Sequence, residues 1–327
     1  MCGKRMDIMN LKNVYYDKNS VFQFSELNES QYLLKLFQNF EKISDGILEN
    51  YEFYIFANDD EKILPDCLNH LSQKKIILYY LADAGGSIDP RPISSNFELI
   101  FKTHLEEAFI SDNVLPISLG YVNDVPELPV KPIHDRNYNV FFRGDLNRNR
   151  FDLYRSFFSQ KKFFPRRGLP TTIFRDMAIG FKNDFSNYFP DSLIIFNKGF
   201  NTGFSAQEFG KVLADSKIIL SPMGFGNAEC FRDFEGMRAG CVIISDKLPK
   251  TEFYDGSPII QVENWKEGLL WAKKLIDDSE MLMDYHLKTV DWWNNKCSEK
   301  AVAIYMKDKI LLNSDNKKII GTVLSEE

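Results

Sequence analysis

The sequence predicts an α/β protein with two units, each built around a mainly parallel β-sheet. Short apolar runs of strand length recur along the chain, amphipathic helical segments lie between many of them, and one proline-rich stretch divides the series. Strands that are covered on both faces read as continuous apolar runs, and alternating strands and helices produce parallel sheets. A chain of 327 residues is long enough for two such units.

Seven runs rich in β-branched and aromatic residues have the length of strands. Three of them precede the proline-rich stretch, at 51–56, 75–80 and 97–101. Four follow it, at 139–142, 193–196, 217–220 and 241–244. Each half of the chain therefore has enough strands for a sheet of its own.

Helical signals lie between and after these runs. Residues 31–43 place apolar side chains on one face at helical spacing. A capping box at Ser205 opens one helix, and another, at 229–239, is closed by Gly240. Further helices are expected at 265–277 and over much of the tail at 281–312.

The proline-rich stretch marks the expected boundary between the units. Pro126, Pro129 and Pro132 recur at every third residue, which favours a stiff extended connector. The alternative is a long surface loop within one domain. With the connector as the boundary, we expect one Rossmann-like unit at 1–130, a second at 131–298 and a helical tail at 299–327, with the first unit as the expected packing partner of the tail.

Composition and cysteine usage indicate a cytoplasmic protein. The 40 basic and 46 acidic side chains give a formal net charge of −6, which argues against a dedicated nucleic-acid or membrane-surface binder. The five cysteines are scattered and form no Cys-x-x-Cys pair, so we expect reduced thiols and no zinc site. The first residues lack the apolar core of a signal peptide, and no apolar run approaches the ~20 residues needed to cross a bilayer.

The segment 217–244 carries the clearest sign of chemistry. It reads as a buried strand, a turn with Gly224 and Gly226, a helix, and a second strand. Open α/β folds bind ligands at the carboxyl edge of the sheet, and a helix that begins near Asn227 would offer backbone N–H groups to phosphate oxygens. On that helix, Arg232 and Glu235 fall on the side away from the core, where Arg232 suits a diphosphate and Glu235 suits ribose hydroxyls. The alternative is an exposed helical face with an ion pair between them.

Residues 232–244, with Asp246 and the Leu248-Pro249 pair after them, resemble a segment of the exostosin-type glycosyltransferases. In that family the donor-binding half carries Arg-x-x-Glu-Ala…Gly-Cys-Ile-Pro-Val-Ile. Residues 205–222 and the Phe-x-Gly…Arg pattern of 142–150 are similar to the same half, so the likeness spans 139–249 in the right order. This sequence departs from the pattern with Gly236 in place of alanine and Ile243 in place of proline.

This resemblance implies a GT-B architecture: two facing Rossmann-like domains, with a UDP-, GDP- or CMP-sugar donor on the second and a glycan or glycolipid acceptor on the first. It places Arg232 near the donor diphosphate, Glu235 near the ribose, and Gly144 under the donor with Arg150 close by. It also implies a role in surface polysaccharide or lipopolysaccharide assembly, with no metal or further cofactor required. Peripheral association with the inner face of the membrane would follow from a lipid-linked acceptor.

Positive charge gathers next to this segment. Residues 131–190 hold twelve Lys and Arg against five Asp, which would attract an anionic donor. Arg143 and Arg150 flank Gly144 and are expected phosphate contacts. The patch also includes the pairs at 161–162 and 166–167. The alternatives are a solvated surface and, less in keeping with the acidic chain, a nucleic-acid platform.

Sugar transfer with inversion needs a base to accept the proton of the acceptor hydroxyl. Two residues that follow predicted strands qualify: Asp83, which precedes two glycines, and His104. Asp145 is a third candidate. The alternatives are that Asp83 caps a turn and that His104 is an ordinary surface histidine.

Two further functions fit two Rossmann-like units. One is a sugar-nucleotide epimerase, and the other is a binding protein that has kept the fold and lost catalysis. No Gly-x-Gly-x-x-Gly fingerprint follows a strand, which weakens a dehydrogenase assignment.

Overall fold

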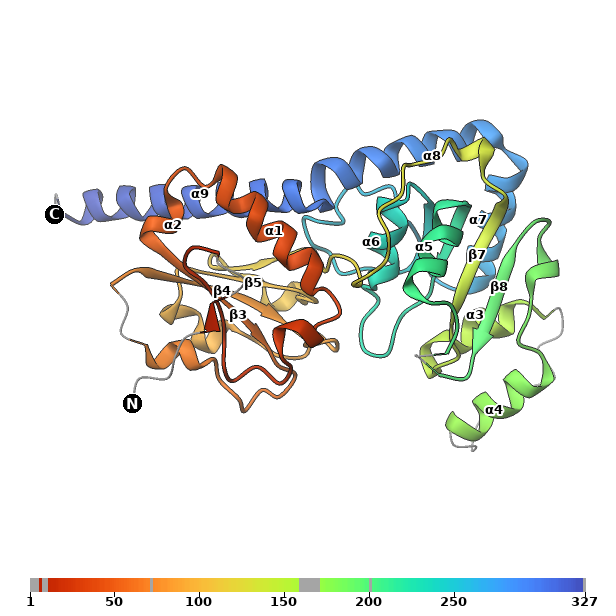
Figure 1. Ribbon diagram of the computed structural model, residues 1–327, viewed down its shortest axis with the longest axis horizontal. Helices are drawn as coiled ribbons and strands as arrows, with labels where there is room; N and C mark the ends of the chain where they lie inside the picture. Colours follow the sequence, from red (N-terminus) through yellow and green to blue (C-terminus); the bar gives the residue numbers. More distant parts are fainter. Residues whose placement is uncertain (1–5, 8–10, 71–72, 159–170, 200–201, 326–327) are drawn as a thin grey trace. The chain divides into compact units, whose positions relative to one another are not determined.

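The computed structural model describes residues 6–7, 11–70, 73–158, 171–199 and 202–325. The chain forms two compact units, and each contains one β-sheet (Figure 1). The two units are made of these segments: Met1–Asn123, Lys250–Phe253 and Asn294–Glu327 in unit 1, and Asp124–Pro249 and Tyr254–Trp293 in unit 2. The C-terminal helix therefore belongs to the unit that also contains the N-terminal strands.

The sheet of unit 1 has six strands that follow one another in chain order. They are β1 (Met6–Asp7), β2 (Val14–Tyr16), β3 (Tyr51–Ala57), β4 (Lys75–Leu81), β5 (Leu99–Lys102) and β6 (Val114–Pro116). All neighbours are parallel except β1 and β2. The longest pairing joins β3 to β4, and every residue of β3 is buried, as continuous apolar strands predict.

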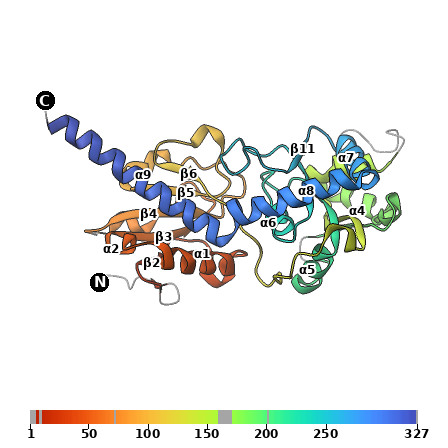
Figure 2. The same cartoon turned by 90° about the horizontal axis from the view of Figure 1, so that it is seen from above.

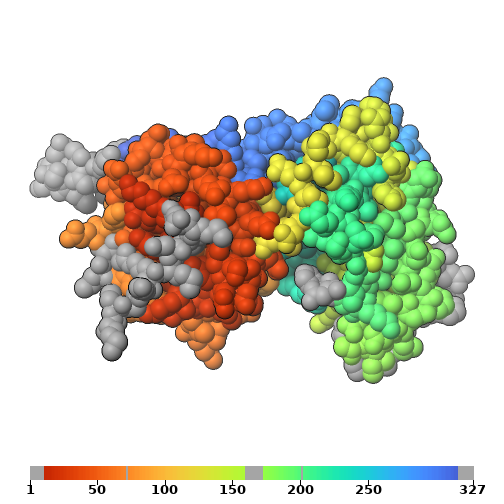
Figure 3. Space-filling model, in the orientation of Figure 1, coloured from red at the N-terminus to blue at the C-terminus, as the bar shows by residue number. Residues whose placement is uncertain are grey.

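Each face of this sheet has a different cover. Helix α1 (Ser30–Ile43) packs Phe37 and Phe40 edge-on against Phe53 of β3. Its polar side forms part of the orange-red surface of unit 1 (Figure 3). The opposite face, with Phe56 and Tyr80, is covered by the long connections that leave β3 and β4. In the described residues of these connections, the helices are the short η2 (Asp66–Asn69) and η3 (Arg91–Asn96).

Helix α9 (Glu299–Ser325) runs beside α1 along unit 1 (Figure 2). Tyr32 of α1 donates a hydrogen bond to the carbonyl of Cys297, just before α9 begins. Further along, the hydroxyl groups of Tyr51 and Ser314 are 2.7 Å apart. Packing of the tail helix on the N-terminal segment is therefore built into unit 1. The short helix α2 (Ile47–Asn50) leads from α1 into β3.

The sheet of unit 2 has five parallel strands. They are β7 (Tyr138–Asp145), β8 (Leu193–Asn197), β9 (Ser216–Ser221), β10 (Val242–Asp246) and β11 (Ile260–Val262). Counted within the unit, the spatial order is 2-1-3-4-5, the doubly wound order of flavodoxin-like folds. In such a sheet the strand order reverses between β7 and β9, and ligands bind outside the carboxyl ends of these two strands.

Six helices of unit 2 surround this sheet. They are α3 (Phe151–Ser156), α4 (Thr171–Phe181), α5 (Ala206–Ala214), α6 (Phe231–Arg238), α7 (Trp265–Asp277) and α8 (Ser279–Trp292). The capping box predicted at Ser205 opens α5, with Glu208 as its partner. Gly240 ends α6 with φ +71°, the left-handed conformation that the predicted stop requires.

Most sequence predictions of elements are confirmed, with shifts of one to three residues at their ends. One helix start is wrong: the helix expected at 229–239 begins at Phe231, because Cys230 takes an extended backbone and acts as the N-cap. The four cysteines in the described part of the chain are free thiols. None of the helices described is both long enough and apolar enough to cross a membrane.

Candidate functional site

The carboxyl ends of β7 and β9 lie side by side, and the loops that follow them are joined. Asn149, after β7, donates from Nδ2 to the carbonyl oxygens of Gly224 at 2.7 Å and Phe225 at 3.1 Å. On the other side, the amide of Met223 donates to Asp246 at the end of β10, at 2.6 Å. The structure thus brings the Gly144 loop and the 222–227 loop, which are far apart in the sequence, to the point where the strand order reverses.

Two arginines converge on Gly144 at this point. A Cβ atom placed on Gly144 would lie 2.9 Å from Nη1 of Arg150 and 3.0 Å from Nη2 of Arg232. Both guanidinium groups also lie over the ring of Phe142, at 6.0 Å and 5.2 Å from its centroid. Only glycine leaves this space free, so the residue type at 144 and the positions of the two arginines depend on one another.

The cluster has an excess of positive charge and spare donors. Arg150 pairs through Nη1 with Asp145 Oδ1 at 2.5 Å, while Arg232 donates from Nη2 to the carbonyl of Arg143 at 3.0 Å. Burial lowers the pKa of Arg150 to about 10, and the like charge of Arg232 acts in the same direction. In the described part of the chain, Nε of Arg150 and both Nε and Nη1 of Arg232 are buried without a hydrogen-bond partner. An anion that accepts hydrogen bonds would satisfy these donors.

Arg143 does not join this cluster through its side chain. Its guanidinium stacks on Phe204 at 3.8 Å from the ring centroid, next to Gly203 and the start of α5. The reason is the alternation of side chains along a strand: Phe142 and Gly144 face one side of β7 and Arg143 faces the other. Arg143 and Arg150 flank Gly144 in the sequence, but the side chain of Arg143 lies against Phe204, and its role as a phosphate contact stays a prediction.

The turn between β9 and α6 differs from the predicted arrangement. The amide of Glu229 donates to Asn227 Oδ1, and that of Cys230 donates to Asp233 Oδ2, both at 3.0 Å. These two N–H groups already have acceptors within the chain, which leaves the arginines as the stronger anion-binding groups. Neither Gly224 nor Gly226 is among the residues with positive φ. Burial raises the pKa of Asp233 to about 7.

Glu235 is buried, whereas the sequence indicated a side of α6 facing away from the core. It is 5% exposed and lines a small void with Arg238, Val125 and other residues of the connector and α5. The connector itself packs on α5, where a Cβ atom on Gly210 would come within 2.5 Å of Pro126. Packing of the proline-rich connector on this side covers Glu235.

The departure from the exostosin-type pattern at 236 has a packing explanation. A Cβ atom on Gly236 would lie 3.1 Å from Cδ1 of Ile219 and 3.3 Å from Cδ1 of Ile243. Isoleucine at 243, where proline is usual in that family, fills the space that an alanine at 236 would enter. The two departures are therefore neighbours in space.

In unit 1, Asp83 follows β4, and its carboxylate accepts hydrogen bonds from three groups. The donors are the amides of Ser87 at 3.3 Å and Ile88 at 2.8 Å, and Nζ of Lys102 at 2.9 Å. The side chains of Lys102 and Asp83 are 0% and 4% exposed. Asp83 thus caps the turn after β4, which is the alternative that the sequence left open.

His104 follows β5 and takes the left-handed conformation, with φ +51°. It is buried, not a surface histidine. Burial raises the pKa of Glu29, the N-cap residue of α1, to about 7, and an electrostatic interaction with His104 acts in the opposite direction. Glu29 was missed in the sequence because nothing near it signals burial. A non-glycine residue in the left-handed conformation and a buried carboxyl group with a strongly raised pKa are both features that occur often at functional sites.

Two further expectations bear on the charge of the site. The basic residues Lys161, Lys162, Arg166 and Arg167 lie outside the described residues. Within the ranges that the structure describes, no three His, Cys, Asp or Glu side chains come together to hold a metal ion.

No family model matches the sequence, and no curated protein matches it either. Several solved structures are similar in fold. HepE of Anabaena, in complex with UDP, has a TM-score of 0.50 and 9% identity over 83% of this chain and 81% of its own. TarM has a TM-score of 0.48 and 13% identity over 85% of this chain, which spans 57% of the length of TarM. A glycosyltransferase of Rickettsia africae has a TM-score of 0.46 and 12% identity over 85% of this chain and 82% of its own.

At 9% identity, the similarity to HepE is a likeness of fold alone. The parallel-sheet α/β units described above match those of GT-B glycosyltransferases, and the chain therefore has the GT-B fold.

Proposed function

We propose that this protein is a glycosyltransferase that binds a nucleotide-sugar donor in unit 2 and transfers the sugar to a glycan or glycolipid. The observation that carries the proposal is the convergence of Arg150 and Arg232 on Gly144, at the carboxyl ends of β7 and β9. This is the place where a 2-1-3-4-5 sheet binds its ligand.

The donor diphosphate is the group that fits the arginine cluster. Arg150 and Arg232 carry two positive charges against the one carboxylate of Asp145, and three of their buried nitrogens are without a partner in the described part of the chain. When the glycosidic bond to the donor breaks, negative charge develops on the departing diphosphate. Guanidinium groups that are already in place stabilise that charge without reorganising. The HepE structure contains UDP, which makes UDP the first ligand to test.

The proton acceptor, in an inverting reaction, is sought in unit 1. Asp83 is committed to Lys102 and two backbone amides, so we assign it a structural role. We place the base at His104 with Glu29. A carboxyl group with a pKa of about 7 is well matched to accepting a proton near neutral pH.

The finer assignments are part of the same proposal. The donor roles of Gly224, Gly226 and Asn227 rest on their place in the turn after β9, and a cytoplasmic site of action rests on cysteine usage and the N-terminal sequence. The donor role of Glu235, the exostosin-like subfamily and a part in polysaccharide or lipopolysaccharide assembly rest on the resemblance of 139–249. A lipid-linked acceptor would bring the protein to the membrane surface.

Nucleotide binding tests the proposal directly. Isothermal titration calorimetry with UDP, UMP and uridine should show that the second phosphate contributes most of the affinity. The Arg232→Ala variant loses charge-assisted hydrogen bonds of about 1.5–3 kcal/mol, so its affinity for UDP should fall roughly 10- to 100-fold. The matched control is Arg148→Ala, which removes the same charge from an exposed position in the same loop and should change the affinity less than threefold.

A wild-type protein that does not bind UDP, GDP or CMP, or an Arg232→Ala variant that binds them as well as wild type, would contradict the proposal. Turnover assays then separate the alternatives. A transferase releases the nucleotide from the donor when an acceptor is present. An epimerase interconverts free nucleotide sugars, and a binding protein releases nothing.

A further inference from the structure

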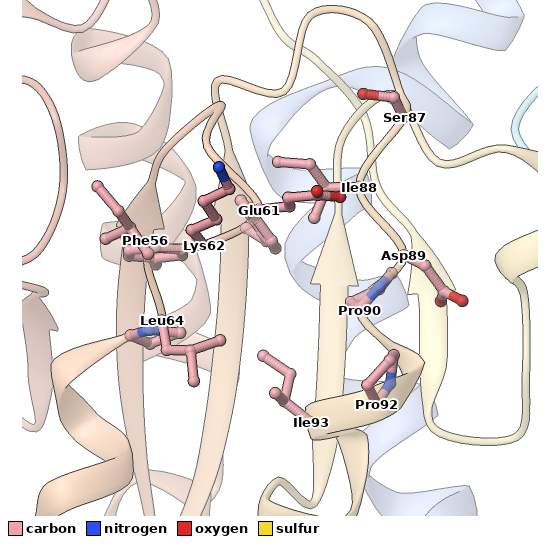
Figure 4. A pocket seen from close by; sticks show the side chains of 13 residues that line it. Phe56, Glu61, Lys62, Leu64, Ser87, Ile88, Asp89, Pro90, Pro92 and Ile93 are labelled. Carbon is pink, nitrogen blue, oxygen red and sulfur yellow. The ribbon is translucent and has the colours of Figure 1, made fainter.

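Unit 1 contains a pocket at the carboxyl ends of β3 and β4 that the proposed donor site does not use. Its volume is about 370 Å³, and the loops that follow these two strands form its walls (Figure 4). At roughly 30 Å³ for each water-sized group, this is room for about a dozen such groups. Pockets of this size hold small ligands or part of a larger one.

The accessible apolar part of the pocket is aliphatic. Phe56 and Tyr80 contribute to the floor but are only 0% and 2% exposed, so neither offers a ring face on which a sugar could stack. The apolar surface that a ligand can reach includes Ile63 and Leu64 of one loop, which are 41% and 51% exposed, and Ile93 of the other, while Glu61 and Lys62 add exposed polar groups. Figure 4 shows Leu64 and Ile93 coming from the two different loops at the same end of the pocket.

Both walls are held in place by buried carboxylates. Asp83 accepts hydrogen bonds from Ser87 and Ile88 in the loop after β4. Asp17, which is 2% exposed, accepts hydrogen bonds from the amides of Asp66 and Cys67 at 3.0 Å and 2.9 Å, where the loop after β3 ends. The pocket is therefore preformed, and little conformational entropy is lost when a ligand enters.

We infer that this pocket binds a hydrocarbon chain of an amphiphilic acceptor, such as the acyl or prenyl chain of a glycolipid. That the ligand is a sugar acceptor rests on the proposed function, whereas that it carries a hydrocarbon chain rests on the pocket alone. An aliphatic lining takes an aliphatic group, while Glu61, Lys62 and Ser87 among the lining residues can bind a polar head. An unlinked sugar would find no exposed aromatic ring on which to stack there, and it would leave the aliphatic surface uncovered.

A series of alkyl glucosides tests the inference. Hexyl, heptyl, octyl, nonyl and decyl glucoside are titrated into the full-length protein, each below the concentration at which it forms micelles, with methyl glucoside as the reference. Burial of each added methylene should raise the affinity about three- to fourfold, or roughly 100-fold from hexyl to decyl. Methyl glucoside should show no measurable binding.

Leu64→Asp places a charge at the mouth of the pocket and should abolish the dependence on chain length. Its matched control is Leu312→Asp on α9 of the same unit, since Leu312 is 58% exposed and does not line the pocket. An affinity that does not rise with chain length, or the same affinities in both variants, would overturn the inference. UDP binding is measured on the same samples. If the wild-type protein did not bind UDP, the proposed function would be contradicted, but an affinity that rises with alkyl chain length would still support a hydrocarbon-binding pocket.

Discussion

The buried pair of Asp83 and Lys102 gives the sharpest test of how unit 1 is built. Nζ of Lys102 lies 2.9 Å from Oδ2 of Asp83, and neither side chain is more than 4% exposed. Asp83→Asn keeps the size and part of the hydrogen bonding of the side chain but removes its charge. The ammonium group of Lys102 would then lose the buried carboxylate that lies 2.9 Å from it.

Removing one partner of a buried ion pair costs about 3–5 kcal/mol of unfolding free energy. For a unit of about 160 residues, each kcal/mol lowers Tm by roughly 2–4 °C, so the expected loss is roughly 6–20 °C. Replacing both partners, as in Asp83→Asn with Lys102→Met, removes both charges and should restore most of the stability.

Thermal unfolding of the full-length variants, followed by circular dichroism, measures the effect. Asp89→Asn is the control, because Asp89 pairs with Arg91 at the surface, where such pairs contribute less than about 1 kcal/mol. If Asp83→Asn melted at the wild-type temperature and had lost sugar transfer, the structural role would be refuted and Asp83 would be the base. A lower Tm that the double variant restores supports the structural role.

Three other experiments, with four substitutions, test separate parts of the reasoning. Gly144→Ala should push aside the ends of two arginine side chains, lowering UDP affinity about tenfold in calorimetry with little change in Tm; unchanged affinity would disconnect Gly144 from the anion site. Glu29 has a pKa of about 7 in the folded protein and 4.5 in the unfolded chain, so the stability of the wild type falls as the pH rises between these values. The Tm of Glu29→Gln should therefore rise relative to that of the wild type from pH 4.5 to 8. Parallel plots of Tm against pH for the two proteins would contradict the raised pKa of Glu29. In a double-mutant cycle measured by urea unfolding, Gly236→Ala and Ile243→Val together should be about 0.5–1 kcal/mol more stable than the sum of the single effects predicts. The reason is that valine lacks the Cδ1 atom that would lie 3.3 Å from the new methyl group at position 236. Additive changes in unfolding free energy would show that the two sites are independent.

The strands and most helices were predictable because their signals are local. Apolar runs, the Ser205 capping box and the Gly240 stop each act within a few residues. The start of α6 was less certain, since several polar residues could cap it and the choice of Cys230 depends on Asp233 reaching back three residues. Side chains alternate along a strand, so the sequence alone indicates that the side chain of Arg143 points to the opposite face of β7 from positions 142 and 144.

The parts of the site that the sequence did not reveal depend on contacts between distant segments. Lys102 lies 19 residues from Asp83 on the neighbouring strand, and this contact decides what the carboxylate does. Glu235 is buried by a connector more than 100 residues upstream. Arg232 reaches Gly144 only because β7 and β9 are neighbours in the sheet. Predicting this contact would therefore require knowledge of the order of the strands in the sheet. A single sequence does not specify these pairings.

Because each unit is made of separate segments of the chain, the gene cannot simply be truncated to express one unit alone. The polypeptide passes from one unit to the other at 123–124, 249–250, 253–254 and 293–294. A clone that stops after the connector would lack α9, and the buried ring of Tyr32 would lose the carbonyl to which its hydroxyl donates. To produce unit 1 alone, one would have to splice the last 34 residues onto the first 123 through a designed linker.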